Sequence, residues 1–323
     1  MRSGGRLPNS ICVGDRLRDY LAYWLEVTRR RVRPSTYEAY DLQVRRLDPY
    51  LGTVQLGRVS PARVQSTYDR LLSVGLSCRS VEQVHAVLHR ALDQAFHWGL
   101  IARNPTKLVA PPRPLRREMT ALTCQELRAL LDTTRDDHWH PLWAVLGTAG
   151  LRIGEALGLK WEDVDLSGRR IAIRRALQRQ RDRGLVFVEP KTAKSRRTIH
   201  LTQLAAKVLK EHRDRQDAAA SSTFGWEEHG LVFPSRFGKP LEPSAVTGAL
   251  ARALNAAGFP RIRVHDLRHT TASILLEAGT HPKIVQDLLG HSTVVLTLDT
   301  YSHLTASLSW QAAQTLDAML AAK

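Results

Sequence analysis

The sequence predicts a mainly α-helical protein with a small antiparallel β-sheet, divided into a helical N-terminal domain and an α+β C-terminal domain. Its 323 residues exceed the length of a typical single compact domain. From residue 15 to about residue 99, apolar residues recur at three- and four-residue steps, which is the period of an amphipathic helix. Between residues 170 and 201 the period changes to two, which indicates β-strands.

Four helices are expected in the N-terminal domain. Pro34 opens the second helix, Ser60 caps the third with Pro61 in its first turn, and Ser80 precedes the fourth. Gly99 is placed to end the fourth helix, because glycine readily adopts the left-handed conformation of a helix C-terminus. The apolar stripe of the first helix consists of Leu17, Tyr20, Leu21, Trp24 and Leu25.

A basic, Pro-rich stretch containing Pro111, Pro112 and Pro114 predicts an extended linker over residues 106–118. Beyond it, Thr123 is a helix cap and residues 140–148 form a mostly buried helix. Strands over residues 170–175, 185–189 and 196–201 form one sheet, with residues 191–195 as the turn between the last two strands. Further helices begin near residues 203, 244, 265, 283 and 310.

The composition favours a nucleic-acid partner. The formal net charge is +16, and residues 1–115 hold 18 Lys and Arg against 9 Asp and Glu. A field of this sign attracts polyanions, although charge that serves only solubility is the alternative. The four arginines between the first two helices are candidates for phosphate contact, with a solvated turn as the alternative. They are Arg29, Arg30, Arg31 and Arg33.

The cysteine pattern and the hydropathy of the chain suggest a cytoplasmic protein. The three cysteines are scattered, which fits a reducing compartment. No signal peptide and no membrane span is expected. We expect neither a metal nor a nucleotide cofactor, because the histidines lack metal-ligand spacing and no Gly-x-x-x-x-Gly-Lys-Ser/Thr loop is present.

Cationic and nucleophilic side chains follow one another in a fixed order along the second half of the chain. Arg152 lies in Leu-Arg-Ile-Gly-Glu, Lys191 in Pro-Lys-Thr, His265 and Arg268 in His-Asp-Leu-Arg-His, and His291 in Leu-Gly-His. Tyr301 follows in Thr-Tyr-Ser-His, and Glu155 lies one helical turn after Arg152. Arg152 and Arg268 can neutralise the charge of a phosphodiester, because each guanidinium can donate two parallel hydrogen bonds. His265 and Arg268 lie three residues apart, so on a helix both can point at one anion. Glu155 can hold the guanidinium of Arg152 in place by the same spacing. Each of these short motifs alone is weak evidence for a function. The specific signal is that all of them occur in this order.

The order Arg, Lys, His-x-x-Arg, His, Tyr closely resembles the active-site signature of the tyrosine recombinase (phage integrase) family, over residues 15 to about 320. The resemblance implies that Tyr301 is the nucleophile that forms a 3′-phosphotyrosyl bond. It implies that Lys191 is the general acid for the leaving 5′ oxygen, with Lys194 as the alternative. His291 would bind the scissile phosphate or accept the tyrosine proton. Ten residues separate His291 from Tyr301, where some members have nine.

The resemblance also implies an organisation and a set of partners. We expect a tail (1–14), a helical core-DNA-binding domain of the SAM-like type (15–105), the linker (106–118), the catalytic domain (119–306) and a C-terminal helix (307–323). The partners would be double-stranded DNA, three further copies of the chain in a homotetramer on two sites, and an excisionase or a host DNA-bending protein as an accessory. The C-terminal helix would contact a neighbouring protomer, or alternatively fold back on its own domain.

The predicted function is site-specific recombination through a Holliday junction, for integration or excision of a phage or mobile element. Three alternatives stay open. They are an Xer-like resolvase of chromosome dimers, a DNA-relaxing enzyme of the type IB topoisomerase kind, and a DNA-binding regulator that has no enzymatic activity. Retention of all six candidate catalytic residues argues against the last.

Overall fold

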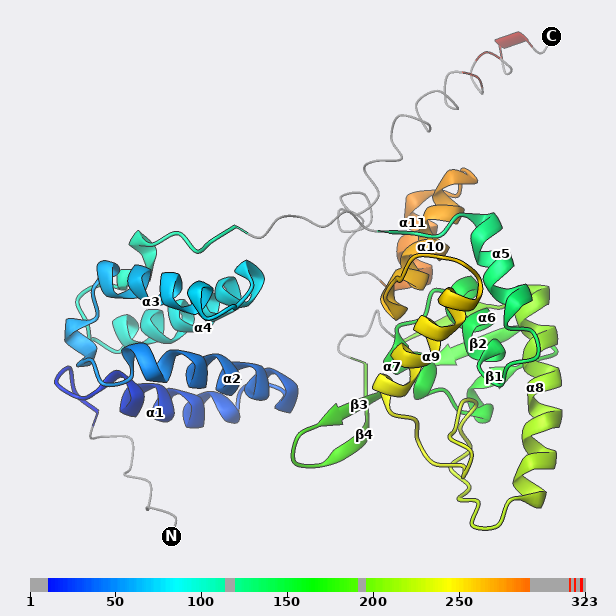
Figure 1. Ribbon diagram of the computed structural model, residues 1–323, viewed down its shortest axis with the longest axis horizontal. Coiled ribbons are helices and arrows are strands. Elements are labelled where there is room, and N and C mark those ends of the chain that lie inside the picture. The colour runs from blue at the N-terminus through cyan, green and yellow to red at the C-terminus, as the bar shows by residue number, and fades with distance from the viewer. Residues whose placement is uncertain are drawn as a thin grey trace. The chain divides into compact units, whose positions relative to one another are not determined.

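The computed structural model describes residues 11–113, 120–190 and 196–290, together with Gln314, Asp317, Leu320 and Ala321. The chain divides into two compact units, Met1–Arg117 and Glu118–Lys323 (Figure 1). Each unit has a hydrophobic core of its own. Among the described residues, no helix combines the length and the apolar character needed to cross a membrane.

The N-terminal unit is a four-helix bundle, as the sequence predicts. Its helices are α1 (Leu17–Arg29), α2 (Pro34–Leu51), α3 (Pro61–Ser73) and α4 (Cys78–His97), with short 3-10 turns η2 (Leu56–Arg58) and η3 (Pro105–Leu108). The predicted stripe of α1 is buried, since none of its five members is more than 6% exposed. Burial of large apolar side chains contributes about 1.5–3 kcal/mol each, so packing of this stripe, more than helix propensity, stabilises α1.

The helix caps of this unit agree with the sequence at α3 and differ at α4. The Oγ of Ser60 accepts a hydrogen bond from the backbone N of Arg63, as predicted. The expectation that Ser80 precedes α4 is wrong, because Ser77 is the N-cap and its Oγ accepts from the backbone N of Ser80 at 3.2 Å. Ser80 therefore lies within the first turn of α4.

The first part of the predicted linker is not extended. Residues 105–108 form η3, which packs on α3 and α4. Thr106 Oγ1 hydrogen-bonds His89 Nδ1 of α4 at 2.8 Å, and Asn104 Nδ2 donates to the His89 carbonyl at 3.0 Å. These buried polar contacts hold the chain against α4, and Val109 also joins the core. Residues 109–113 have no regular structure, and residues 114–119 lie outside the described part of the chain.

Seven helices of the second unit lie within its described residues. They are α5 (Cys124–Thr133), α6 (His140–Ala149), α7 (Ile153–Leu157), α8 (Gln203–Ser222), α9 (Pro243–Ala256), α10 (Val264–Glu277) and α11 (Pro282–Leu289), with the 3-10 turn η4 (Trp161–Asp163). The α6 helix is buried over nearly its whole length, as predicted, and contacts α5, α7, α8 and α10. The predicted cap of α5 is confirmed: Thr123 and Glu126 form a capping box.

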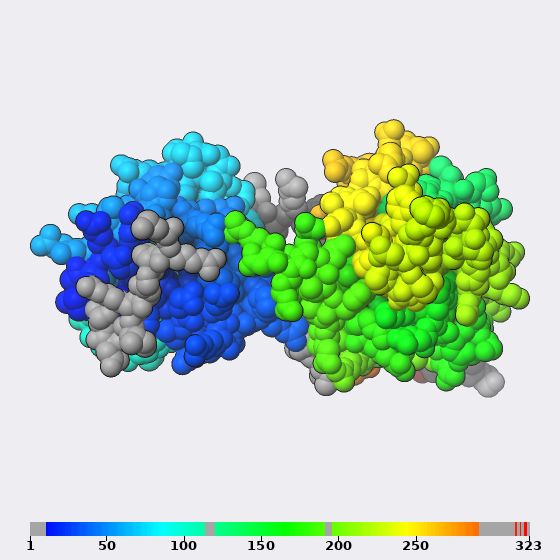
Figure 2. Space-filling view, turned by 90° about the horizontal axis from the view of Figure 1, so that it is seen from below, coloured from blue at the N-terminus to red at the C-terminus, as the bar shows by residue number. Residues whose placement is uncertain are grey.

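The strands form two sheets, where the sequence predicted one. An antiparallel sheet has the order β1 (Val164–Asp165), β2 (Arg170–Ile173), β5 (Arg197–His200), and pairs Ile171 with Ile199. The other sheet is a hairpin of β3 (Ala176–Gln180) and β4 (Gly184–Val188), which projects from the surface of the unit (Figures 1 and 2). The prediction that residues 185–189 share a sheet with residues 170–175 and 196–201 is therefore wrong.

Local pairing and packing explain the second sheet. A short turn joins β3 to β4, and Gly184 adopts the positive φ that this turn requires. The β3 strand also packs closely on α7, because a Cβ at Gly154 would lie 2.7 Å from the Leu177 carbonyl oxygen. At the junction of β2 and β3, Arg175 donates to Asp163 at 2.7 Å and to Glu162 at 2.8 Å. These contacts direct the chain away from the first sheet.

Candidate active site

Arg152 lies at a sharp turn between α6 and α7. Gly150 ends α6 with φ +60°, and a Cβ at this position would lie 2.7 Å from a methyl group of Leu289. Glycine is therefore required both for the backbone conformation and for close packing. Arg152 then takes the N-cap position of α7, and 39% of its side chain is exposed.

Glu155 fixes the orientation of Arg152. It lies in the first turn of α7, and its Oε2 accepts a hydrogen bond from the backbone N of Arg152 at 3.0 Å. Its Oε1 accepts from Nη1 of Arg152 at 2.8 Å, so the contact expected from their spacing is present. Glu155 is only 5% exposed, and a buried carboxylate that is hydrogen-bonded on both oxygens has little freedom to move.

Arg197 on β5 is the second partner of Glu155, and the sequence did not assign it to the site. Its Nη1 donates to Oε1 of Glu155 at 3.2 Å, and its Nη2 donates to Oε2 at 3.0 Å. Its side chain is 7% exposed. The strand alternation carries a signal for it: Arg197 shares the inward face with the buried residues Ile199 and Leu201, and a charge on that face requires a partner.

Arg268 is the most deeply buried of the candidate residues. It lies on α10 and is 1% exposed. Its Nη1 donates to the Gly150 carbonyl at 2.7 Å, and its Nη2 donates to the Leu289 carbonyl. Arg268 thus connects the C-terminal ends of α6 and α11.

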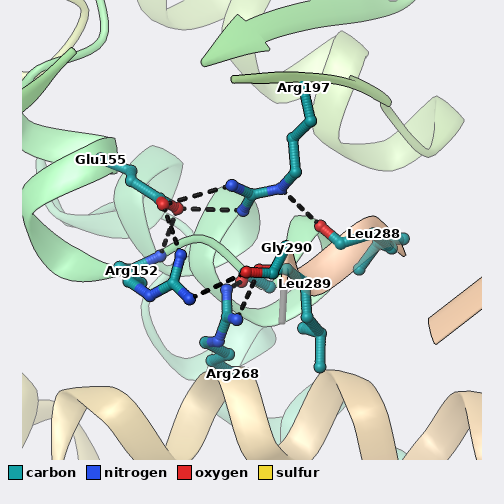
Figure 3. Close-up of polar contacts among 8 residues, drawn as sticks. Arg152, Glu155, Arg197, Arg268, Leu288, Leu289 and Gly290 are labelled. Carbon is teal, nitrogen blue, oxygen red and sulfur yellow. Dashed lines mark hydrogen bonds and ion pairs between the residues drawn. The ribbon is translucent and has the colours of Figure 1, made fainter. Parts of the chain in front are cut away.

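Three arginines converge on the C-terminal end of α11 (Figure 3). Arg197 donates to the carbonyl of Leu288, Arg268 to that of Leu289, and Arg152 to that of Gly290. The last carbonyls of a helix have no partner within the helix and carry its negative partial charge, so they suit cations. Three separate segments of the chain therefore meet at one helix end. Gly290, with φ +64°, is the residue before His291 in the sequence.

The carboxylate of this cluster is ionised. Burial opposes ionisation of Glu155, but hydrogen bonds and charge from Arg197, and then from Arg152, outweigh burial and hold its pKa below the ordinary value. The cluster therefore holds three cations, Arg152, Arg197 and Arg268, and one anion, Glu155. Of the three guanidiniums, that of Arg152 belongs to the side chain that reaches solvent, since it is 39% exposed while Arg197 and Arg268 are enclosed.

Two histidines lie beside the cluster, and both have lowered pKa values. Partial loss of water around the ring, followed by the charge of Arg268, lowers the pKa of His265, although the residue is exposed at the surface. Burial, followed by the nearby His265, lowers the pKa of His269 to about 4. The ring centroids of His265 and His269 lie 4.8 Å apart. Asp266 fixes the first turn of α10, which carries His265, because it accepts a hydrogen bond from the backbone N of Arg263 at 2.8 Å.

The structure brings Arg152, Glu155, His265 and Arg268 together in the second unit, and adds Arg197. Lys191, its alternative Lys194, His291 and Tyr301 lie outside the described residues. So does most of the predicted C-terminal helix over 307–323, of which Gln314, Asp317, Leu320 and Ala321 are described as helical and exposed.

The arginines expected to contact DNA lie on the surface of the N-terminal unit. All four are exposed: Arg29 is the last residue of α1, and Arg30, Arg31 and Arg33 lie in the connection to α2. Arg29 contacts the ring of Tyr37, with 5.4 Å from its guanidinium carbon to the ring centroid, and pairs with Glu26 at 3.7 Å. Neither contact involves a buried charge.

In the described part of the chain, no group of three or more His, Cys, Asp or Glu side chains is arranged to hold a metal ion.

The cluster can bind and polarise an anion. A guanidinium that is fixed on its inner side and partly exposed on its outer side is preorganised for a phosphate, which accepts two parallel hydrogen bonds from arginine. A neutral histidine nearby can donate or accept a proton at pH 7.

Comparisons with known proteins agree with this geometry. The phage integrase family model matches residues 120–307, and the model of the N-terminal SAM-like domain of phage integrases matches residues 16–72. An integrase from Streptomyces ambofaciens is 31% identical over 91% of this chain and 76% of its own length. A protein named tyrosine recombinase XerC-like, from Caldanaerobacter subterraneus, is 29% identical over 93% of this chain and 82% of its own.

Solved structures share the fold. The Tn1549 transposon integrase in complex with transposon right end DNA has a TM-score of 0.81 and 22% identity, over 94% of this chain and all of that chain. A lambda integrase tetramer bound to a Holliday junction has a TM-score of 0.65 and 16% identity, over 89% of this chain and 77% of that chain. The family model covers more than half of the chain, and the two units match its two domain types. The chain therefore belongs to the phage integrase family and is a tyrosine recombinase, an enzyme that cleaves and rejoins DNA strands.

Proposed function

We propose that the cluster at the end of α11 binds the scissile phosphate of a double-stranded DNA site, with Arg152 as its first contact. The observation that carries this proposal is the state of Arg152. Its guanidinium is held from within by Glu155 and the Gly290 carbonyl, while 39% of the side chain reaches solvent. In a chain of net charge +16, this arrangement is suited to a polyanion.

Arg268 and His265 complete the phosphate site in this proposal. Arg268 is 1% exposed and is held by the Gly150 and Leu289 carbonyls, so it supplies a fixed positive charge at the same helix end as Arg152. His265 is neutral at pH 7, so it can donate a hydrogen bond to a phosphate oxygen without adding a fixed charge.

The chemical steps use Tyr301, Lys191 and His291. The Tyr301 oxygen attacks phosphorus and forms the 3′-phosphotyrosyl bond, while His291 accepts the phenolic proton or binds the phosphate. The bond to the 5′ oxygen breaks, and Lys191 gives that oxygen a proton. The 5′-hydroxyl of another strand then attacks the phosphotyrosyl bond and releases Tyr301. No external energy source is needed, because one phosphodiester is replaced by another.

The assembly that fits this chemistry is a homotetramer on two DNA sites, in which strands are exchanged through a Holliday junction. The arginines at 29, 30, 31 and 33 would contact phosphates, and the C-terminal helix would contact a neighbouring protomer. The biological role would be integration or excision of a phage or mobile element in the cytoplasm, with an excisionase or a host DNA-bending protein as an accessory.

A DNA substrate with a nick next to the scissile phosphate tests the chemistry, because loss of the short leaving strand traps the covalent protein–DNA adduct. Tyr301→Phe removes only the hydroxyl, so it should abolish the adduct on denaturing gels and leave DNA affinity nearly unchanged. Persistence of the adduct in Tyr301→Phe would show that Tyr301 is not the nucleophile.

The same assay tests the general acid. A 5′-thio leaving group needs no proton, so Lys191→Ala should regain cleavage activity on a substrate that carries it. Recovery of Lys194→Ala in its place would reassign the general acid.

A further inference from the structure

Arg197 is a buried cation that contacts both neighbours of the Arg152 guanidinium. One of these neighbours is Glu155, with which Arg197 forms two hydrogen bonds at 3.2 and 3.0 Å. The other is the end of α11, where Nε of Arg197 donates to the Leu288 carbonyl at 2.7 Å. Figure 3 shows both guanidiniums at the carboxylate of Glu155, with Arg152 below it and Arg197 to its right.

By fixing the carboxylate of Glu155, Arg197 also fixes the orientation of the Arg152 guanidinium. Each carboxylate oxygen accepts one hydrogen bond from Arg152 and one from Arg197. Without Arg197, a carboxylate that is 5% exposed would be left with one cation in place of two. Its pKa would rise, and its rotation would no longer be fixed from both sides.

The contact with α11 acts on the other partner of Arg152. The Gly290 backbone packs directly against the Arg197 side chain, since a Cβ at Gly290 would lie 3.0 Å from Nη1 of Arg197. The Gly290 carbonyl is the group to which Nη2 of Arg152 donates. Arg197 therefore fixes the carboxylate and the carbonyl that together set the direction of the Arg152 guanidinium.

We propose that Arg197 is a positioning residue: it directs the Arg152 guanidinium at the scissile phosphate through Glu155 and the end of α11, and does not itself contact DNA. This inference rests on the proposed phosphate-binding role of Arg152. Misplacement of a reacting group by about 1 Å can cost ~10²-fold in rate. We therefore expect Arg197→Ala to slow cleavage by about 10- to 100-fold while the Kd for DNA changes by less than about threefold.

A neutral substrate separates positioning of Arg152 from a general structural role. Replacing one non-bridging oxygen of the scissile phosphate by a methyl group removes its negative charge, so a correctly placed guanidinium is needed much less. Single-turnover cleavage would be measured on the ordinary phosphate and on the methylphosphonate, for the wild type, Arg152→Ala, Arg197→Ala and Arg197→Lys. Arg197→Lys keeps the charge and loses the two-pronged contact, and it serves as the test if Arg197→Ala does not fold.

Arg196→Ala is the matched control, because Arg196 is the adjacent residue and pairs with Glu189 on the surface. It should cleave both substrates at nearly the wild-type rate. For both Arg152→Ala and the Arg197 variants, the loss of rate on the ordinary phosphate should shrink on the methylphosphonate. Adding Arg197→Ala to Glu155→Gln should cost much less than it does in the wild type, because both changes break the same connection.

Three results would overturn the inference, and they have different meanings. If the Arg152→Ala defect shrinks on the neutral substrate and the Arg197 defect does not, Arg197 is structural only and the proposed function stands. If the Arg152→Ala defect itself does not shrink, the phosphate-binding role of Arg152 fails, and the inference fails with it. A wild-type cleavage rate in both Arg197 variants would show that Arg152 needs no such support.

Discussion

Arginines gather in two regions of this protein, and the two regions hold them differently. At the end of α1 and in the connection to α2 they are exposed, and the side chain of Arg29 is 62% accessible. At the end of α11, the side chains of Arg197 and Arg268 are almost wholly enclosed. Their guanidiniums are held by backbone carbonyls and by the carboxylate of Glu155.

The difference between the two regions teaches how one residue type can serve affinity and chemistry separately. Exposed cations attract DNA over a distance, but water and salt weaken each contact and the side chain stays mobile. Buried cations lose hydration, which is costly unless hydrogen bonds replace it. The open carbonyls at the ends of α6 and α11 supply those bonds. The result is a fixed charge that needs no reorganisation during the reaction.

The largest expected effect is on the buried region. Arg268→Ala should slow DNA cleavage by at least ~10²–10³-fold, because it removes a preorganised cation and leaves the Gly150 and Leu289 carbonyls without their donor. DNA affinity should fall far less, because it is spread over many phosphates. Single-turnover cleavage and equilibrium binding, measured on the same substrate, compare the two losses. Arg261→Ala, at an exposed position before α10, is the control. Equal losses in both measurements would reassign Arg268 to DNA docking.

The exposed region should show the opposite behaviour. Replacing Arg29, Arg30, Arg31 and Arg33 by glutamine should weaken DNA binding and lower the salt dependence of log K by roughly 0.9 for each phosphate that is no longer neutralised. Cleavage at saturating DNA should stay within about threefold of wild type, because these residues do not touch the reacting phosphate in our proposal. Glutamine variants of Lys207 and Lys210, which are exposed on α8, remove two positive charges and are compared with the double variant of Arg30 and Arg31, so that the loss of net charge is equal. An unchanged salt slope would mean that the arginine-rich connection is a solvated turn.

The sequence predicted the residues that act through local spacing. Ser60 and Thr123 were recognised as caps because a cap needs only its own first turn. Glu155 was placed beside Arg152 because three residues make one helical turn. The helical bundle and the buried α6 followed from apolar periodicity in the same way.

What the sequence missed depends on contacts between distant segments. Strand alternation places Arg197 on the inward face and Arg196 on the outward face, but only the fold shows that the partner of Arg197 is Glu155, at 3.0 Å. The role of the α11 carbonyls was also missed. Every residue has a backbone carbonyl, so residue types do not show which carbonyls accept hydrogen bonds from arginines. The division of the strands into two sheets depends on Arg175 contacting Glu162 and Asp163, which are 13 and 12 residues away.

The smallest effect concerns the histidines, and it sharpens the comparison in the buried region. His269 should titrate with a midpoint near 4, as measured by NMR of 15N-labelled histidine, because burial and the nearby His265 disfavour its charged form. Folding stability from this group is therefore present above the unfolded pKa of about 6.5, and is lost as the pH falls from there toward 4. His265→Gln removes the second cause, so it should raise the midpoint of His269. An unshifted His269, with a midpoint near 6.5, would mean that water reaches its ring, and that the enclosure of Arg268 does not extend to the neighbouring residue.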